Sequence, residues 1–286
     1  MLNNENATIF IPDGADRATA LSRTTHLAIS AHQDDIELMC PQGVLECFGS
    51  SEKYFTGVVT ADGAGSPRNG IYAGYTDEEM KMVRIREQQK AAFVGEYSAQ
   101  LQLGYTSSQI KDGGFDPIVD EYVEILKATR PDVVFTHNLA DKHDTHMGVV
   151  TKVIKAIRRL TKSERPRKLY GGEVWRDLDW MLDEDKVVFD TSAHPNITAG
   201  IMSVFDSQIC GGKRYDLASE GRRISHATYY ASHGCDTAES LNYCMDLTPL
   251  IEDDTMSVTD YVLTFVDRFR NDVVERIKKV SDSSEK

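Results

Sequence analysis

Short apolar runs alternate with longer segments of helical periodicity over the first 175 residues. The apolar runs have the length of buried strands, and they lie at residues 26–30, 54–60, 101–103, 132–136 and 169–175. The segments between them predict helices, at residues 34–48, 76–95, 118–126 and 149–160. Strands that alternate with helices of this length are typical of βαβ units and a mostly parallel sheet.

The alternation weakens after Trp175. The later pattern predicts a strand at 187–189, a helical stretch at 195–216 and an amphipathic helix at 262–277. No repeat or linker divides the chain. We therefore expect one α/β domain over residues 1–286, a Rossmann-like, mostly parallel sheet with flanking helices. Its core spans about 24–180, and a less regular C-terminal extension spans about 181–286.

Composition narrows the range of partners. The 286 residues carry a net charge of -13 and no prominent cluster of Lys and Arg, which argues against nucleic acid. Residues 1–25 lack the apolar core of a signal peptide, and no apolar run is long enough to cross a membrane. The five cysteines form no CxxC pair, as is typical of a reducing compartment. We expect a cytoplasmic protein that binds neither nucleic acid nor membranes.

The first chemical cluster follows directly on the apolar run at 26–30. It contains His32, Asp34 and Asp35. His32 and Asp35, three positions apart across a turn, can converge on one divalent ion. Asp34 then points elsewhere from the same turn and can take a proton from an attacking water. The alternative is that two acidic residues at a helix start only complement the helix dipole.

A second cluster follows the run at 132–136. His143 and His146 are three apart at a helix start, so one can bind a metal while the other acts as an acid or oxyanion partner. Asp141 and Asp144 can hold these imidazoles in the required tautomer, and His137 is as readily a structural histidine. The alternative is a polar loop of helix-capping residues. Together the clusters indicate a metal-dependent hydrolase.

Both clusters resemble the motifs of the PIG-L/LmbE-like deacetylase family. The family motif AHPDDxEL stands here as AHQDDIEL at residues 31–38, with Gln33 in place of proline. The family motif DxHxDH stands here as DKHDTH at 141–146, with Thr145 in place of the last aspartate. A glycine-containing loop at 58–65 and an RxxE helix at 84–87 fit the family order, so the resemblance covers roughly residues 26–160.

The resemblance implies a Rossmann-like fold with one divalent metal ion per chain, usually Zn²⁺. The implied reaction removes an N-acyl group, most often N-acetyl, from a glucosamine-containing small molecule. Carried over residue by residue, the metal ligands are His32, Asp35 and His146. Asp34 is the base that activates a metal-bound water, and His143 stabilises the tetrahedral intermediate or protonates the leaving amine.

The resemblance also implies two substrate-binding residues, Arg84 and Asp112, and a homo-oligomer, a trimer or hexamer. An amidase acting on a thiol-sugar or other amide conjugate shares the same site, so the sequence does not separate it from a deacetylase. A dinucleotide-dependent oxidoreductase is disfavoured because no G-x-G-x-x-G follows the first strand. A non-catalytic sugar-binding module is disfavoured by the complete set of acid, base and ligand groups. Trp175 and Trp180 can stack on a sugar, but we expect them to pack against the protein.

Overall fold

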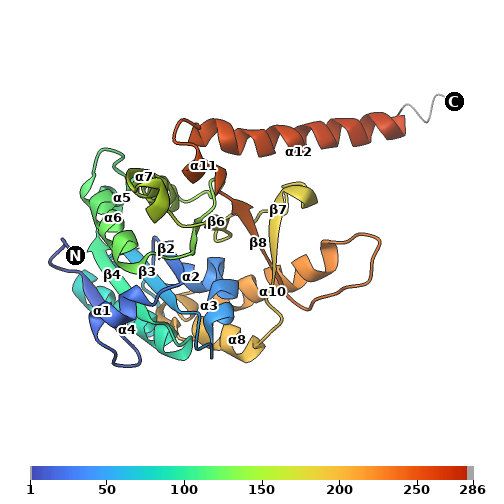
Figure 1. Cartoon of the computed structure of the whole chain (residues 1–286). Helices are drawn as coiled ribbons and strands as arrows, with labels where there is room; N and C mark the ends of the chain where they lie inside the picture. The colour runs from blue at the N-terminus through green and yellow to red at the C-terminus, as the bar shows by residue number, and fades with distance from the viewer. Residues whose placement is uncertain (1, 282–286) are drawn as a thin grey trace.

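A single sheet forms the centre of the molecule in the computed structural model, which describes residues 2–281 (Figure 1). Its strand order is β1-β4-β3-β2-β5-β6-β8-β7. Five central strands are parallel: β4 (Ala99–Tyr105), β3 (Phe55–Ala61), β2 (His26–Ser30), β5 (Val133–His137) and β6 (Lys168–Gly172). Three strands at the two edges are antiparallel to their neighbours: β1 (Thr8–Phe10), β8 (Leu241–Asp246) and β7 (Lys186–Asp190). The predicted α/β fold with a mostly parallel sheet is confirmed.

Helices cover both faces of this sheet. The longer ones are α4 (Asp77–Val94), α6 (Pro117–Thr129), α7 (Asp144–Arg159), α8 (Pro195–Ser203), α10 (Tyr215–Tyr229) and α12 (Val258–Ser281). The shorter ones are α1 (Arg17–Ser22), α2 (Asp35–Met39), α3 (Pro41–Cys47), α5 (Ser107–Lys111), α9 (Asp206–Ile209), α11 (Pro249–Glu252) and the 3-10 turns η1 (Gly70–Tyr72), η2 (Lys162–Glu164) and η3 (Asp183–Asp185).

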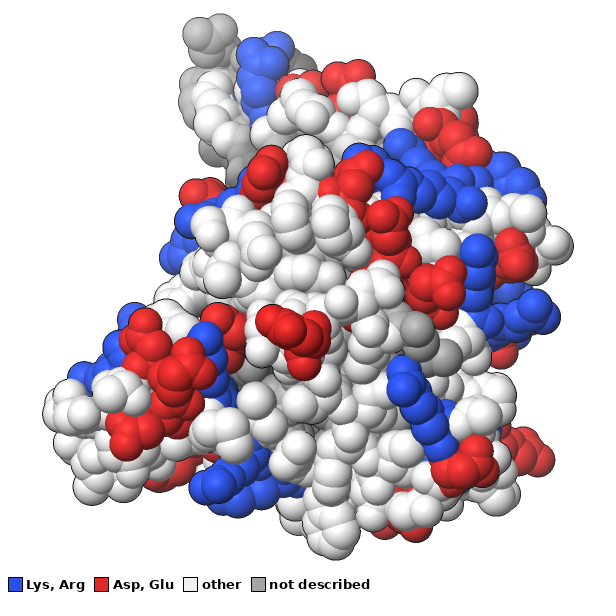
Figure 2. All heavy atoms as spheres, turned by 90° about the vertical axis from the view of Figure 1, so that its left-hand side faces the viewer, with Lys and Arg blue, Asp and Glu red and all other residues white. Residues whose placement is uncertain are grey.

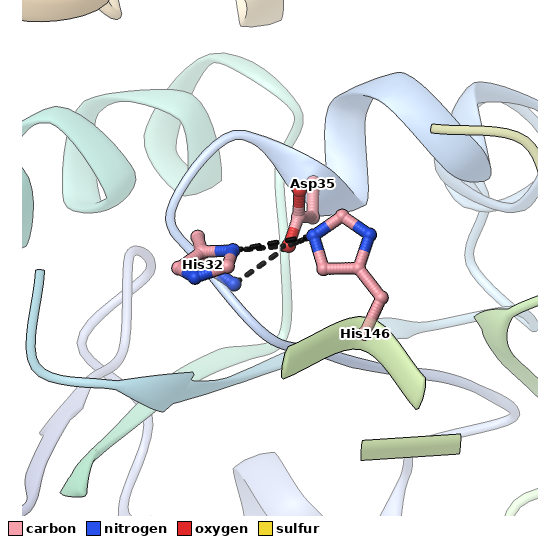
Figure 3. A group of neighbouring side chains, drawn as sticks. All are labelled: His32, Asp35 and His146. Carbon is pink, nitrogen blue, oxygen red and sulfur yellow. Dashed lines mark hydrogen bonds and ion pairs between the residues drawn. The ribbon is translucent and has the colours of Figure 1, made fainter. Parts of the chain in front are cut away.

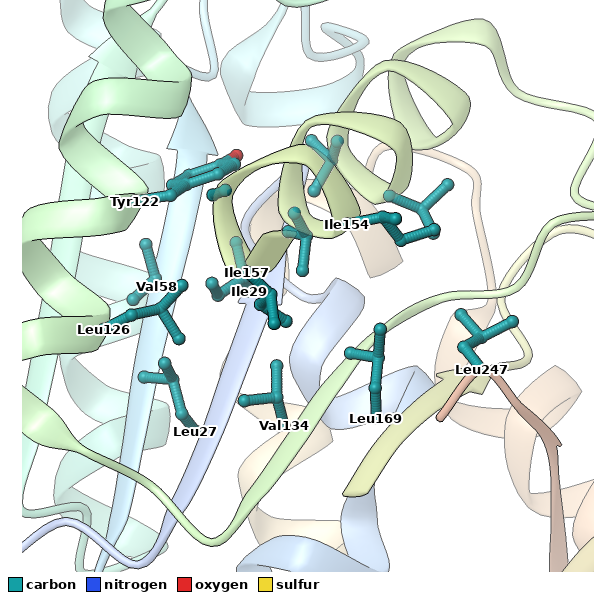
Figure 4. Packing of buried hydrophobic residues seen from close by; sticks show 14 of the residues in the cluster. Leu27, Ile29, Val58, Tyr122, Leu126, Val134, Ile154, Ile157, Leu169 and Leu247 are labelled. Atoms are coloured by element: carbon teal, nitrogen blue, oxygen red, sulfur yellow. The ribbon is translucent and has the colours of Figure 1, made fainter. Parts of the chain in front are cut away.

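Alternate residues of the central strands face two separate hydrophobic clusters. Leu27 and Ile29 of β2 pack with α6 and α7 on one face of the sheet (Figure 4), and Ala28 packs with α2 and α3 on the other. All residues of β2 and β3 are buried, because helices cover both faces. Burying one Leu or Ile side chain stabilises the fold by about 1.5–3 kcal/mol. This two-sided core fixes the positions of the central strands. It therefore also fixes the strand ends that carry the two chemical clusters.

The helix predicted at 34–48 is two helices. The break lies at Cys40, whose φ of -141° and ψ of 47° end α2. Pro41 starts α3 at its first turn, where a missing N–H leaves no hydrogen bond unmade. A proline also disfavours the helical conformation for the residue before it, which explains the break.

The C-terminal part departs most from the sequence pattern. The stretch predicted as helical at 195–216 splits into α8 and α9, and α10 continues to Tyr229. Strand β8, which the pattern missed, pairs with β6 and β7, so the C-terminal residues extend the central sheet. Helix α12 projects from the body (Figure 1), and none of its residues is buried.

Among residues 2–281, no helix combines the length and hydrophobicity needed to cross a membrane. On the face shown in Figure 2, positively and negatively charged side chains are interspersed. This face therefore carries no broad surface of one charge sign.

Candidate active site

The two chemical clusters meet at the carboxyl ends of two neighbouring parallel strands. His32, Asp34 and Asp35 follow β2, and the second cluster follows β5, which pairs directly with β2. Open α/β sheets bind ligands in the crevice beyond these strand ends. A cavity of about 560 Å³ lies there, and it is lined by His32, Asp34, Asp35, Arg84 and His143 among others.

His32, Asp35 and His146 form a nearly equilateral triangle of ligand atoms (Figure 3). His32 Nδ1, Asp35 Oδ2 and His146 Nε2 lie 3.3 Å from one another along all three edges. Tetrahedral ligands about 2.0–2.1 Å from a zinc ion are about 3.3–3.4 Å apart. The donor set and its spacing therefore fit one small divalent cation.

The ionisation of Asp35 suits a metal ligand. Burial raises its pKa, but the imidazoles of His146, His137 and His32 outweigh burial and hold the pKa well below the usual range. Asp35 Oδ2 also accepts a hydrogen bond from the backbone N–H of His32 at 2.6 Å. The carboxylate is thus ionised and fixed in direction.

Two further residues of the second cluster orient the triangle. Asp141 Oδ2 lies 3.3 Å from His146 Nδ1, the nitrogen that faces away from the triangle. A carboxylate in this position fixes the imidazole tautomer and its direction. His137 stacks on His146 with ring centroids 3.9 Å apart, and its Nε2 accepts a hydrogen bond from the N–H of Ala31. His137 is therefore a buried positioning residue, whereas Asp144 is exposed at the start of α7.

Asp34 has a different environment from its neighbour. Its Oδ2 pairs with Arg84 Nη2 at 3.0 Å, and its backbone φ of 89° places it in the left-handed region. Burial raises the pKa of Asp34 to about 6, although the Arg84 guanidinium opposes this. Arg84 is 1% exposed and also pairs with Glu87 at 3.0 Å. Arg84, predicted to bind substrate, thus lines the cavity, but its guanidinium forms an ion pair with Asp34.

His143 lines the cavity beside the triangle. Its Nδ1 accepts a hydrogen bond from the N–H of Thr145, which assigns the proton of the neutral ring to Nε2. Burial and the nearby His146 lower the pKa of His143. The ring stacks on His146 at a centroid distance of 4.6 Å. A neutral imidazole here can donate a hydrogen bond from Nε2 to a bound oxyanion.

Asp112, the second predicted substrate-binding residue, lies outside the cavity lining. Its Oδ1 accepts a hydrogen bond from the N–H of Gly114 at 2.9 Å in an exposed turn. The structure therefore does not bring Asp112 to the other predicted site residues.

The sequence pattern did not indicate the residues that line the outer cavity, namely Trp175, Lys213 and Arg222. Trp175, expected to pack against the protein, lines the cavity and stacks on His143 at a centroid distance of 6.3 Å. Lys213 and Arg222 also line it. Lys213 precedes α10 and Arg222 lies within it. Neither residue has a characteristic sequence spacing from the two motifs. Only the aromatic character of Trp175, the last residue of a predicted strand, was a signal in the sequence.

Comparisons with known proteins identify one matching family model and several solved structures of similar fold. Residues 27–157 match the family model PIG-L, described as GlcNAc-PI de-N-acetylase. A search of curated protein sequences finds no match to the chain.

Three solved structures illustrate the range of proteins with this fold. N,N'-diacetylchitobiose deacetylase from Pyrococcus horikoshii has 12% identity and a TM-score of 0.62, over 83% of this chain and 88% of that one. 4-Carboxy-2-hydroxymuconate hydratase from Pseudomonas putida has 14% identity and a TM-score of 0.59, over 78% and 96%. The zinc-inhibited form of teicoplanin deacetylase has 15% identity and a TM-score of 0.53, over 78% and 98%. At these identities the likeness establishes the fold alone.

Proposed function

Because the chain belongs to the PIG-L family through its residues 27–157, we propose that it is a metal-dependent N-deacetylase of a glucosamine-containing small molecule. The observation that carries this proposal is the 3.3 Å triangle of His32, Asp35 and His146 beside an ionisable Asp34. Deacetylases among the proteins of similar fold support it.

The metal site is proposed for one divalent ion per chain, with zinc as the first choice. Two imidazoles and one carboxylate are a ligand set that zinc accepts, and a structure of similar fold is described as zinc-inhibited. When bound, such a cation polarises an acyl oxygen and makes water more acidic.

Asp34 supplies the base. Its Oδ2 is held by Arg84, while no hydrogen bond occupies Oδ1 within residues 2–281. The carboxylate lines the cavity next to the triangle and can accept a proton from the attacking water. Arg84 keeps the carboxylate pointed at the cavity and stabilises its charged form.

His143 stabilises the tetrahedral intermediate. Its Nε2–H donates a hydrogen bond to the oxyanion that develops on the former acyl carbon. The proton that Asp34 takes from the water goes to the departing amine as the C–N bond breaks. Acetate and a free amino sugar are the products, so one water is consumed for each amide cleaved.

Acetate release from a panel of N-acetylglucosamine compounds tests the proposal. We expect turnover that a chelator abolishes and Zn²⁺ restores, together with about one metal ion per chain by elemental analysis. Thiol-sugar amides in the same panel test the amidase alternative. If the protein binds no divalent metal, the proposal is wrong. A metal-loaded protein that hydrolyses other amides, and releases no acetate, would instead identify the amidase.

A further inference from the structure

We propose that the outer cavity binds an oxyanion on the substrate, a phosphate or a carboxylate, through Lys213 and Arg222 beside Trp175. The site would then be selective for an anionic amino sugar over a neutral one. This inference rests on the proposed function, because it places the N-acetyl group at the triangle of His32, Asp35 and His146.

A stack of rings leads from the triangle to the outer cavity. His146 lies against His143 at an interplanar angle of 28°, and His143 lies against Trp175 at 19°. Trp175 is therefore two ring contacts away from the metal ligands. Aromatic rings of this kind bind the apolar face of a sugar. A pyranose with its N-acetyl group at the triangle thus directs its other substituents toward Trp175.

Two cations that form no ion pair within residues 2–281 line the same cavity as this ring. Lys213 Nζ is 5.2 Å from the centroid of Trp175. Arg222 Nη1 donates a hydrogen bond to the carbonyl oxygen of Val174, the residue before Trp175, at 2.8 Å. Within residues 2–281, neither Lys213 nor Arg222 forms an ion pair, and the remaining guanidinium donors of Arg222 have no protein acceptor. Lys142 Nζ lies 6.0 Å from the same ring and adds positive charge.

The carboxylates that line the cavity are already paired. Asp34 pairs with Arg84 at 3.0 Å, Asp35 contacts the imidazoles of the triangle, and Asp62 lies 3.4 Å from Lys81 Nζ. The charge left without a partner in the cavity is therefore positive, although the whole chain carries -13. Like charges gathered beside one aromatic ring repel each other, and a bound oxyanion removes that repulsion while accepting their hydrogen bonds.

Steady-state kinetics with matched substrates provides the first test. The neutral probe is the methyl glycoside of N-acetylglucosamine, and the anionic probes are N-acetylglucosamine 1-phosphate, N-acetylglucosamine 6-phosphate and N-acetylmuramic acid. We expect kcat/KM to be roughly tenfold or more higher for at least one anionic probe, the effect of one charged hydrogen bond. The phosphate and carboxylate probes separate the two oxyanion sources.

Variants assign the effect to residues. Lys213→Gln and Arg222→Gln should each lower kcat/KM for the preferred anionic probe roughly tenfold and leave the neutral probe nearly unchanged. Arg222→Lys, which keeps the charge, should retain most of the preference. Arg176→Gln is the matched control, since Arg176 is exposed, lies next to Trp175 and does not line the cavity. Equal kcat/KM for neutral and anionic probes, or a preference that survives both glutamine variants, would overturn the inference and leave the deacetylase proposal standing.

Isothermal titration calorimetry separates this inference from the deacetylase proposal. The ligands are glucosamine 6-phosphate, glucosamine 1-phosphate, muramic acid and neutral glucosamine. We expect tighter binding of at least one anionic compound, which weakens with added salt and with either glutamine variant. If no probe is hydrolysed but this binding pattern holds, the anion site stands and the deacetylase proposal fails. If no probe is hydrolysed and none of the anionic compounds binds more tightly than glucosamine, both fail.

Discussion

Adjacent carboxylates in the first motif have opposite surroundings although they share one turn. The φ of 89° at Asp34 sends its side chain to Arg84, while Asp35 points to the imidazoles. A non-glycine residue in this conformation costs on the order of 1–3 kcal/mol. The contacts of Asp34 with Arg84, and of its backbone N–H with Gln88 at 3.2 Å, oppose that cost. The strained turn thus separates the proposed base from the proposed ligand.

The base can be tested by Asp34→Asn. Asparagine keeps an acceptor for Arg84 but cannot take a proton, so we expect kcat to fall about 10²–10⁴-fold. Metal content should stay near that of the wild type, because Asp34 is not part of the 3.3 Å triangle. Elemental analysis and acetate release measure the two quantities. Near-normal turnover in this variant would contradict the role of Asp34.

Glu173 predicts a dependence of stability on pH. Burial raises its pKa to about 7, while the usual value is 4.5, so the folded state favours its protonated form. Stability from this group is fully present below pH 4.5 and is lost as pH rises through 7. His226, 3.6 Å away, acts in the opposite direction, because burial lowers its pKa to about 4 and stability is lost as pH falls below 6.5.

The Glu173→Gln variant isolates the contribution of the Glu173 carboxyl group to this pH dependence. Between pH 5.5 and pH 8 the wild type should lose on the order of 2 kcal/mol more stability than the variant, because glutamine cannot ionise. Urea unfolding at the two pH values measures this difference. The same pH dependence in both proteins would show that folding does not raise the pKa of Glu173.

Among the elements, the break between α2 and α3 and the projection of α12 have separate physical causes. Pro41 and the conformation of Cys40 explain the break. The first half of α12 contacts the body through Val258, Tyr261 and Phe265 among others, and Arg268 pairs with Glu184 at 3.3 Å. Its later turns expose apolar side chains such as Ile277, which is 61% exposed.

A truncation at the end of α12 tests this division. Deleting residues 272–286 removes no buried side chain within the described part of the chain, so we expect the free energy of unfolding to change by less than about 0.5 kcal/mol. Deleting residues 257–286 is the matched comparison, because it removes Tyr261, whose hydroxyl donates to the carbonyl oxygen of Asp246. This longer deletion should destabilise the protein clearly. A large loss from the shorter deletion would indicate that the end of α12 is packed in solution.

For the whole molecule, the proposed metal ion would couple the two halves of the central sheet. The proposed ligands come from the segments after β2 and after β5, so a bound ion joins residues more than a hundred positions apart. Such an ion stabilises the folded state according to its concentration and affinity.

Zinc should therefore raise the melting temperature. At a free concentration of about 100 times Kd, the stabilisation is about 2.7 kcal/mol. Differential scanning calorimetry with chelator and with Zn²⁺ measures the shift. The shift should disappear in His146→Ala and persist in Asp34→Asn, each compared with itself without metal. An equal shift in wild type and His146→Ala would place the zinc elsewhere.

The expected homo-oligomer, a trimer or hexamer, stays a prediction that light scattering can test.

The sequence alone determined the parallel core and the composition of the two clusters. Continuous apolar runs such as that at 26–30 report burial on both faces, and the spacing of His32 to Asp35 within one turn is a local property. The capping residues at Thr76 and Glu79 likewise set the start of α4 by contacts within one turn. These features depend on neighbours in the chain, so periodicity and spacing are enough to predict them.

Only the tertiary structure decided which distant segments meet. Strand β8 was not predicted because its partners β6 and β7 are distant in the sequence. Local sequence patterns do not determine which strands pair. Trp175 comes to the cavity wall because the backbone after β6 passes Asp141, whose Oδ2 accepts its N–H at 3.1 Å. Arg84, expected to bind substrate, instead meets Asp34 across 50 residues because α4 packs beside the first motif. Sheet order and helix packing determine these contacts, and both depend on interactions summed over the whole fold.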